Sequence, residues 1–150
     1  MFACSTFAIG KEIYGIDIKY VIEIIGIQPV TGVMDLPNYI KGIINLRGKI
    51  VPVMDIRLRL KKNFKDYNDR TCIIVVNIGE VFIGLIVDNV SEVISIPEGN
   101  IVIPTSKQAC FSSRYIEGIG KVGNDIALII SCNKLLGQDE VDNINKQLTN

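Results

Sequence analysis

Residues 39–60, YIKGIINLRGKIVPVMDIRLRL, carry the pattern from which the fold class can be predicted. Gly48 separates two apolar runs of β-forming residues, which predicts a hairpin with its turn at that glycine. Pro52 stands inside the second run and cannot donate a ladder hydrogen bond, so this strand should lie at an edge or be bulged there. Arg47 stands beside the turn, where a stiff hairpin would hold its guanidinium in a fixed place.

The composition describes a neutral protein with ample material for a core. The chain has 150 residues, of which 48% are hydrophobic, and its formal net charge is zero. This length predicts one domain or two very small ones. The neutral charge argues against a nucleic-acid partner, which favours a basic face. The chain contains no histidine, so it lacks the commonest general base and the commonest metal ligand of proteins.

The cysteines indicate a reducing compartment. Four are present, at Cys4, Cys72, Cys110 and Cys132, and none forms a Cys-x-x-Cys motif. Three of them stand in apolar runs, where buried free thiols are expected. The first residues show neither a basic segment nor a long apolar block, so no signal peptide is predicted. We therefore expect reduced thiols and a cytoplasmic location.

Short β-type runs separated by turn residues recur along the chain. In addition to the hairpin, the expected strands span residues 2–9, 13–18, 22–28, 71–78, 81–87, 93–96, 115–122 and 126–130. Asp17 is placed to cap a single helical turn. Near the C-terminus, apolar residues spaced three or four apart predict an amphipathic helix over about 133–148, with Asn133 as a candidate cap.

The chain also contains a weak internal repeat. Residues 15–25 align with 84–94, residues 39–43 with 115–119, and residues 50–54 with 126–130. Gly42 then corresponds to Gly118 and Glu23 to Glu92, so the fold itself is the simplest cause of these residues. Two modules with many short strands and little helix predict two small closed barrels. The alternative is that glycine and isoleucine are common enough to align by chance.

Arg47 differs between the modules, because Gly123 takes its place in the second hairpin. The fold alone therefore does not require an arginine there, and both a solvated surface residue and a binding residue are open interpretations. Glu23 could pair with Arg47 and orient the guanidinium if their strands are neighbours. The alternative is that the two residues are unrelated surface charges.

For each candidate catalytic residue, a structural role is a sufficient explanation. Asp55 ends a strand that runs into charged residues, and Asp88 ends an apolar strand with ordinary turn chemistry. Ser112 and Ser113 have no histidine partner and no nucleophile-elbow setting. The sequence therefore predicts a protein that is not an enzyme, holds no metal and uses no cofactor. A hydrolase that uses Asp55 or Asp88 and a nucleic-acid-binding pair of barrels are the alternatives.

Residues 39–57, which include Asn45-Leu46-Arg47-Gly48, resemble the signature hairpin of the CheW family of chemotaxis coupling proteins. Residues 12–18, 84–90 and 115–119 are similar to other family blocks in the right order, and the resemblance covers roughly residues 5–137. It implies a mainly β fold of two intertwined five-stranded SH3-like barrels with a C-terminal helix, in a single domain. We expect the first barrel at about residues 14–70, the second at about 1–13 plus 71–132, and the helix at about 133–148.

The same resemblance implies a cytoplasmic adaptor that couples methyl-accepting chemotaxis receptors to the regulatory domain of the histidine kinase CheA, without nucleic acid or membrane insertion. The positions implied for receptor binding are Val21, Glu23, Gly42 and Arg47, and those implied for kinase binding are Ile24, Val30 and Pro37. A groove between barrels would hold a receptor helix by apolar anchors and one oriented arginine.

One departure from the family concerns the end of the last strand. The family often has an acidic Leu-Asp-x-Asp pattern there, whereas this chain has Ile130-Ser131-Cys132-Asn133. The missing charges put in doubt any contact that the family makes at this edge, but not the fold.

Overall fold

The computed structural model describes residues 2–103 and 114–149, which form a β-rich molecule with short helices. The strands are β1 (Phe2–Ile9), β2 (Glu12–Asp17), β3 (Val21–Gly26), β4 (Ile40–Leu46), β5 (Lys49–Asp55), β6 (Cys72–Ile78), β7 (Val81–Val87), β8 (Asn89–Ile96), β9 (Ile101–Val102), β10 (Ile116–Val122) and β11 (Asp125–Ile130). The helices are η1 (Ile18–Tyr20), α1 (Ile56–Arg59), η2 (Glu98–Asn100), α2 (Cys132–Leu135) and α3 (Gln138–Thr149). As predicted, Asp17 caps the single turn η1, by accepting a hydrogen bond from Lys19 N–H at 3.0 Å. The short strand β9 has no counterpart among the expected strands.

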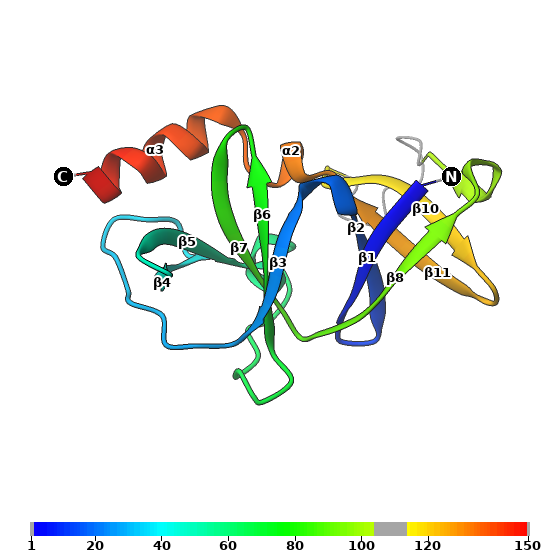
Figure 1. The fold of residues 1–150 in the computed structure, drawn as a ribbon, viewed down its shortest axis with the longest axis horizontal. Helices are drawn as coiled ribbons and strands as arrows, with labels where there is room; N and C mark the ends of the chain where they lie inside the picture. The colour runs from blue at the N-terminus through cyan, green and yellow to red at the C-terminus, as the bar shows by residue number, and fades with distance from the viewer. Residues whose placement is uncertain (1, 104–113, 150) are drawn as a thin grey trace.

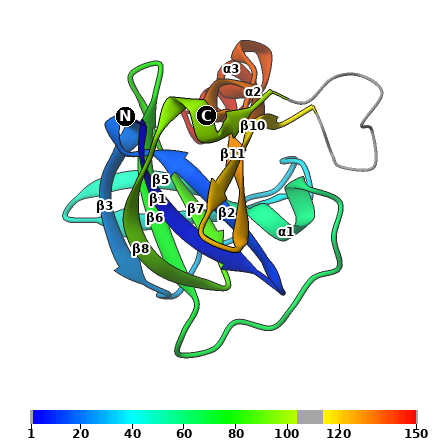
Figure 2. The same ribbon diagram turned by 90° about the vertical axis from the view of Figure 1, so that its right-hand side faces the viewer.

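The strands form two sheets that lie side by side (Figure 1). One sheet has five strands in the order β3-β6-β7-β5-β4, and the other has six in the order β8-β1-β2-β11-β10-β9. The five-stranded sheet closes on itself, because Thr31, beyond β3, exchanges backbone hydrogen bonds with Ile43 of β4 at 2.8 and 2.9 Å. In the other sheet, Ile96 of β8 packs against Gly120 of β10. Figure 2 looks at this second sheet from its side and shows β1, β2, β8 and the β10–β11 hairpin grouped together. We call the five-stranded sheet the first barrel and the six-stranded sheet the second.

The two barrels are intertwined, because each module contributes its first hairpin to the other barrel. β1 and β2 belong to the first module but pair with β8 and β11 of the second, whereas β6 and β7 pair with β3 and β5. The repeat holds at the level of single residue pairs, since Gly84 lies opposite Val53 in one parallel ladder and Gly15 lies opposite Ile129 in the other. The β4–β5 and β10–β11 hairpins also carry a bulge at the same place. The prediction of two intertwined barrels is confirmed.

The strands are divided between the barrels differently from the expected boundaries. The prediction places residues 14–70 in the first barrel, but β2 lies in the second barrel, and β6 and β7 lie in the first. The sheet of the second barrel has six strands rather than five, because β9 pairs with β10. Sequence patterning shows where strands occur but not which strands are neighbours. The exchange of hairpins depends on two parallel pairings between distant segments, which such patterning does not reveal.

The expected C-terminal helix is broken into two. α2 ends at Leu135, and Leu136 adopts an extended conformation with φ of −140°. The side chain of Glu140 then accepts a hydrogen bond from Gly137 N–H at 3.0 Å, at the start of α3. Ser131, not Asn133, occupies the cap position of α2. α2 stands at the same place in its module as α1 does in the first, so of the two C-terminal helices only α3 lies outside the repeated plan.

One apolar core joins the two barrels. Phe7, Leu85 and Leu128 are fully or almost fully buried in it and come from both sheets. Val141 and Ile144 of α3 pack on the same core, and α3 runs along the top of the first barrel in Figure 1. Smaller clusters occupy the interior of each barrel. Burial of these side chains is the main stabilising contribution in such a layered fold.

Pro52 lies inside β5, which is flanked by β7 and β4. The expectation of an edge strand is therefore wrong for β5 as a whole. On the β4 side, Ile43 lies opposite Pro52 but directs its N–H and C=O to Thr31 instead of β5. On the β7 side, the pairing of β5 with β7 begins only at Val53. The proline thus stands where no ladder bond needs its missing N–H. The expected bulge occurs in the partner strand β4.

Candidate docking site

Arg47 and Gly48 form the two-residue turn of the β4–β5 hairpin. Their φ angles are 52° and 86°, as a type I′ hairpin turn requires. Gly48 N–H donates to Asn45 Oδ1 at 2.7 Å across the turn. Arginine is an uncommon choice at such an angle, because the left-handed region favours Gly, Asn and Asp. The second hairpin has Gly123 at the equivalent position, with φ of 61°. Backbone geometry therefore does not explain why this residue is an arginine.

Glu23 holds Arg47 from the opposite edge of the five-stranded sheet. Arg47 Nη2 donates to Glu23 Oε2 at 2.9 Å, so of the two interpretations that the sequence leaves open, the structure shows the ion pair. β3 and β4 are the two edge strands of this sheet, and the pair spans the closure of the barrel. The Arg47 side chain remains 71% exposed, whereas that of Glu23 is 26% exposed. An exposed pair of this kind contributes little to stability but orients the guanidinium.

The second carboxylate oxygen of Glu23 is also informative. Oε1 is buried and has no hydrogen-bond partner among the described residues. A buried acceptor without a donor costs free energy, so it needs an explanation. On the same strand, Ile22 and Ile24 are 46% and 41% exposed. β3 thus carries Glu23, which orients Arg47 and keeps a free acceptor, and two exposed apolar side chains at the alternating positions on either side of it.

The other two residues implied for receptor binding are less accessible. Val21 packs against the core that joins the barrels. Gly42 is buried, and a Cβ added to it would lie 2.0 Å from Thr31 O. The close approach of two backbone segments therefore explains this glycine. Of the four implied positions, the structure brings Glu23 and Arg47 into contact and gives Gly42 a structural role.

The three residues implied for kinase binding lie in different parts of the first barrel. Ile24 is exposed on β3. Val30 is partly buried and packs against the interior cluster of the barrel. Pro37 precedes β4, and its C=O accepts a hydrogen bond from Ile40 N–H at 3.0 Å. Ile24 is thus the most exposed of the three, and the kinase assignment stays a prediction.

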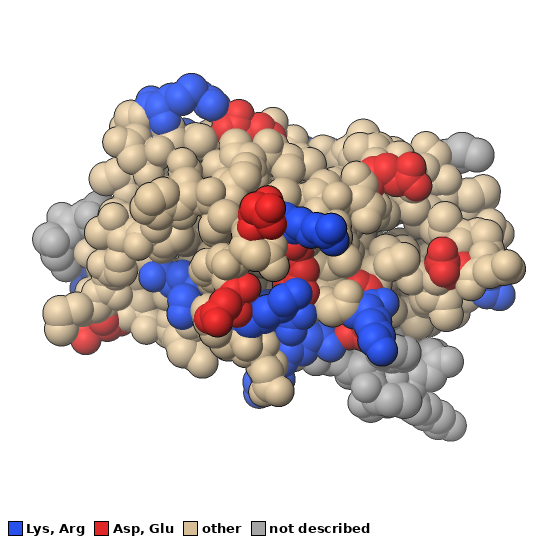
Figure 3. Space-filling view, turned by 90° about the horizontal axis from the view of Figure 1, so that it is seen from below, with Lys and Arg blue, Asp and Glu red and all other residues tan. Residues whose placement is uncertain are grey.

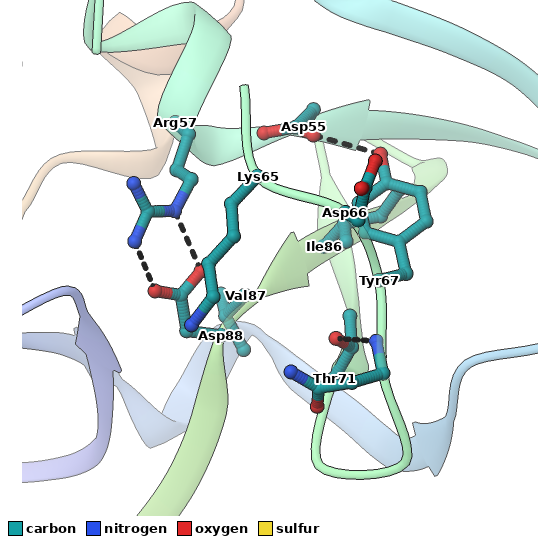
Figure 4. A pocket seen from close by; sticks show the side chains of 10 residues that line it. Asp55, Arg57, Lys65, Asp66, Tyr67, Thr71, Ile86, Val87 and Asp88 are labelled. Carbon is teal, nitrogen blue, oxygen red and sulfur yellow. Dashed lines mark hydrogen bonds and ion pairs between the residues drawn. The ribbon is translucent and has the colours of Figure 1, made fainter. Parts of the chain in front are cut away.

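A second ion pair joins the two barrels and is not apparent from the sequence (Figure 4). Arg57 of α1 donates from Nε to Asp88 Oδ1 at 2.8 Å and from Nη2 to Asp88 Oδ2. Gly10 N–H, in the turn between β1 and β2, donates to the same carboxylate at 2.8 Å. Asp88 stands where the chain passes from β7 of the first barrel to β8 of the second. This bidentate pair therefore fixes the crossover, whereas the sequence shows only a polar residue at a strand end.

Acid should weaken the Arg57–Asp88 ion pair, which we call the clamp. Burial raises the pKa of Asp88, but the hydrogen bonds from Arg57 and Gly10 N–H outweigh burial and leave that pKa below its ordinary value. The pKa of an aspartate in the unfolded chain is about 3.9. The clamp therefore contributes its full stability above this pH, and the contribution is lost as the pH falls through the lower pKa that Asp88 has in the folded protein. We expect the free energy of unfolding to fall less steeply in Asp88→Asn than in the wild type between about pH 5 and about pH 3. Urea titrations over this range measure both slopes.

Arg57→Met provides the control for that prediction. It should flatten the acid dependence in the same way, because it removes the group that lowers the pKa of Asp88. An Asp88→Asn protein with the wild-type slope would contradict the proposed origin of the acid dependence.

Asp55 lines a small hollow beside the Arg57–Asp88 pair (Figure 4). It is 2% exposed, and its carboxylate accepts hydrogen bonds from Leu58 N–H at 3.3 Å and from Tyr67 OH at 2.7 Å. The hollow has a volume of about 10 Å³, which is room for about one water molecule. Capping of α1 and the bond to Tyr67 account for Asp55, and the clamp accounts for Asp88. Neither carboxylate therefore needs a hydrolytic role to explain its position.

A third charged cluster attaches α3 to the barrels. Arg59 is 8% exposed, and it donates from Nε to Leu135 O at 2.7 Å and from Nη2 to Glu140 Oε1 at 2.8 Å. Its guanidinium carbon lies 4.2 Å from the ring centroid of Tyr39 and 5.0 Å from that of Tyr115. These tyrosines are equivalent in the repeat, so both modules contact one arginine. Tyr39 OH also donates to Glu140, and burial together with this bond raises the pKa of Tyr39 to about 12.

Within residues 2–103 and 114–149, no group of three or more His, Cys, Asp or Glu side chains is placed to hold a metal ion. None of the helices in this part of the chain has the length and apolar character needed to cross a membrane. Cys4, Cys72 and Cys132 are free thiols. Cys110 and the serines at 112–113 lie outside the described residues.

Charged side chains of both signs are interspersed on the face shown in Figure 3. Acidic and basic side chains also form ion pairs elsewhere in the described residues, such as Arg57–Asp88 and Lys62–Glu12. A nucleic-acid interface would carry Lys and Arg clustered along one stripe. The mixed pattern on this face favours contacts with other proteins over contacts with a phosphate backbone.

Comparison with known proteins identifies the family of this chain. The family model of the CheW-like domain matches residues 3–140. Chemotaxis protein CheW of Klebsiella aerogenes is 37% identical over 143 residues, which cover 93% of this chain and 86% of that protein. Chemotaxis protein CheW of Bacillus subtilis is 35% identical over 130 residues, which cover 87% and 83%. The crystal structure of the scaffolding protein TtCheW from Thermoanaerobacter tengcongensis has a TM-score of 0.84 and 34% identity, and the match covers 93% of this chain and 94% of that one. Since these matches extend over both barrels, the chain belongs to the CheW family.

Proposed function

We propose that this protein is a cytoplasmic chemotaxis adaptor that couples methyl-accepting receptors to the histidine kinase CheA by protein–protein contacts. Membership of the CheW family supports the adaptor role. The observation that carries the receptor contact is the Arg47–Glu23 pair, in which an exposed arginine is held on a turn whose backbone favours glycine. A residue that breaks a local backbone preference is the expected sign of a binding role.

The surroundings of Arg47 suit a receptor helix. Ile22, which neighbours Glu23 on β3, offers an exposed apolar contact. The guanidinium can donate to acidic or amide side chains, and Glu23 Oε1 is an acceptor without a donor. An amphipathic helix that supplies apolar anchors and a hydrogen-bond donor would satisfy all three features.

Kinase binding belongs to the same proposal. We assign it to the first-barrel surface around Ile24, Val30 and Pro37, which the family resemblance implies. Receptor and kinase would then influence each other through a coupling free energy between two docking surfaces. No cofactor or chemical step is needed for this activity.

Arg47→Gly should separate a binding role from a structural one. Glycine adopts the positive φ of this turn without a steric cost, so the melting temperature should equal or exceed that of the wild type. Receptor recruitment should nevertheless fall by at least about tenfold, because the oriented guanidinium is lost. Co-sedimentation with receptor cytoplasmic fragments measures recruitment, and thermal unfolding of the same samples measures stability.

Arg70→Gly is the matched control, because Arg70 is an exposed arginine in the loop before β6. It should leave receptor recruitment unchanged. In the Arg47→Gly protein itself, binding to the isolated kinase regulatory domain should fall less than receptor recruitment does. A folded Arg47→Gly protein that recruits receptor normally would rule out this assignment of Arg47.

A further inference from the structure

The second barrel contains a cavity at a place where the first barrel is filled. The cavity has a volume of about 140 Å³ and is lined by residues of β1, β2, β8, β10 and β11. Thr6, Ile13, Val122 and Ala127 are among its walls, and Glu92 and Asp125 are its acidic lining residues. We call this cavity and its two carboxylates the mouth of the second barrel.

The repeat shows why the mouth is hollow. Ile44 pairs with Val51 in the first barrel as Gly120 pairs with Ala127 in the second, so equivalent interior positions can be compared directly. The five pairs, with the first-barrel residue named first, are Ile44 and Gly120, Val51 and Ala127, Leu46 and Val122, Phe82 and Ile13, and Val75 and Thr6. In four pairs the second-barrel side chain is smaller, and in the fifth a methyl group is replaced by a hydroxyl. Ile96 occupies the space above Gly120, but the remaining volume stays open.

The charged residues around the interior also differ between the barrels: two cations of the first barrel are replaced in the second. In the first barrel, Lys49 Nζ lies 3.5 Å from the centroid of the Phe82 ring, and Arg47 pairs with Glu23. In the second barrel, Asp125 takes the place of Lys49 and Gly123 takes the place of Arg47.

The second barrel nevertheless keeps its copy of the acid, Glu92, which corresponds to Glu23. Neither Glu92 nor Asp125 forms an ion pair with another described residue. Lys11 lines an adjoining open hollow but not the cavity itself. In the part of the chain that the structure describes, the mouth therefore lacks both the large apolar side chains and the cations that complete the first barrel.

We propose that the mouth of the second barrel binds a segment of another protein in which a large apolar side chain, Phe or Leu, adjoins an Arg or Lys. The apolar side chain fills the volume that Phe82 and Leu46 fill in the first barrel. A cavity of this size accepts a benzene-sized group, as apolar cavities of about 150 Å³ do. The cation neutralises Glu92 and Asp125, as Arg47 neutralises Glu23. Ile126, which also lines the cavity and is 58% exposed, extends the apolar contact outward.

Three short peptides test this pairing of apolar and basic groups. The probe is acetyl-Ala-Phe-Arg-Ala-amide, and its controls carry Glu in place of Arg or Ala in place of Phe. In ¹⁵N-labelled protein at low salt, the probe should shift the backbone amides of Thr6, Ile94, Val122 and Ala127 in a saturable manner. Each control peptide should bind at least about tenfold more weakly.

Substitutions in the protein complete the test. Ile13→Phe and Ala127→Val each introduce the residue that the first barrel has at the equivalent position, and the double variant, if folded, should abolish probe binding. Glu92→Gln with Asp125→Asn should remove the preference for Arg over Glu without blocking the cavity. Ile50→Ala changes the exposed first-barrel counterpart of Ile126 and should have no effect.

Several results would overturn the proposal. They are an absence of saturable shifts, shifts centred on the first barrel, or equal binding of the Arg and Glu peptides. Self-association of the wild type that is lost in Ile13→Phe, measured by sedimentation velocity, would instead identify a second copy of this chain as the occupant.

Discussion

Gly42→Ala should lower the free energy of unfolding by more than about 3 kcal/mol, among the largest effects expected of a single substitution. Gly42 has a φ of 146°, which side-chain-bearing residues rarely adopt, and its new Cβ would lie 2.0 Å from Thr31 O. The obstacle is a backbone carbonyl, and Thr31 is itself tied to Ile43 by two backbone hydrogen bonds. Relief of the overlap would therefore break the contact that closes the first barrel. Urea unfolding at neutral pH measures the change.

Two other glycines provide graded controls. Gly26, at the end of β3, has no atom within 4 Å of an added Cβ, so Gly26→Ala should change stability by less than about 1 kcal/mol. Gly118 is the repeat equivalent of Gly42, but its added Cβ would meet the side chain of Ile101 at 3.0 Å. Because a side chain yields more easily than a backbone carbonyl, Gly118→Ala should fall between the other two. If Gly42→Ala and Gly118→Ala were equally mild, the close backbone approach would not be the reason for Gly42.

The expected instability of Gly42→Ala also matters for the assignment of Gly42 to receptor binding. Gly42 is buried, so loss of receptor binding in a Gly42 variant follows from loss of folded protein. Receptor binding by Gly42→Ala must therefore be compared at equal concentrations of folded protein. Under that condition we expect the deficit to be much smaller than in Arg47→Gly, whose guanidinium is exposed.

The sequence predicts the fold well where local patterns decide it. Gly48 between two β-type runs predicts the β4–β5 hairpin, and the repeat predicts the matching β10–β11 hairpin. The partners of β2 and β7 are not predictable in this way, because each forms a parallel ladder with a strand far away in the sequence. Such pairings depend on the packing of many side chains, which no short window contains. The expected boundary at residue 70 is wrong for this reason.

The candidate site is predictable in its charges but not in its backbone. The opposite charges of Glu23 and Arg47 make an ion pair one of two open interpretations, and the decision between them depends on the closure of the first barrel, which brings the edge strands β3 and β4 together. The positive φ of Arg47 is not predictable, because arginine gives no sign of a left-handed conformation. The Arg57–Asp88 clamp is missed because its partners belong to different strand–helix units, and their contact depends on how the hairpins are exchanged between the barrels.

The structure also shows what duplication makes possible. Both barrels share a strand plan and a register, so the strand plan alone does not account for the differences between their side chains. The first barrel has a filled interior and an oriented arginine on its turn. Among the described residues, the second has smaller interior side chains, the acids Glu92 and Asp125 without an ion pair, and Gly123 in place of the turn arginine. Two copies of one plan therefore present two different surfaces, which is what the proposed coupling of two partners would require.

Arg59→Met should destabilise the protein by about 3 kcal/mol, because it removes one partner of a largely buried ion pair and leaves the other polar groups in place. Glu140 loses its cation, Leu135 O loses its donor, and the rings of Tyr39 and Tyr115 lose the guanidinium between them. Amide hydrogen exchange should show the greatest loss of protection in α3, which Glu140 attaches to the barrels. Exchange and urea unfolding, measured together, distinguish detachment of α3 from global loss of stability.

A double-mutant cycle with Glu140→Gln identifies the source of that effect. Once the carboxylate is gone, Arg59→Met should cost less than in the wild type, by about 1–2 kcal/mol. Arg70→Met, at an exposed arginine, is the control and should be nearly neutral. Additive effects of Arg59→Met and Glu140→Gln would show that the arginine acts through the two tyrosine rings and the Leu135 carbonyl alone. Because those tyrosines come from equivalent positions of both modules, Arg59 would then hold the two halves of the repeat together independently of α3.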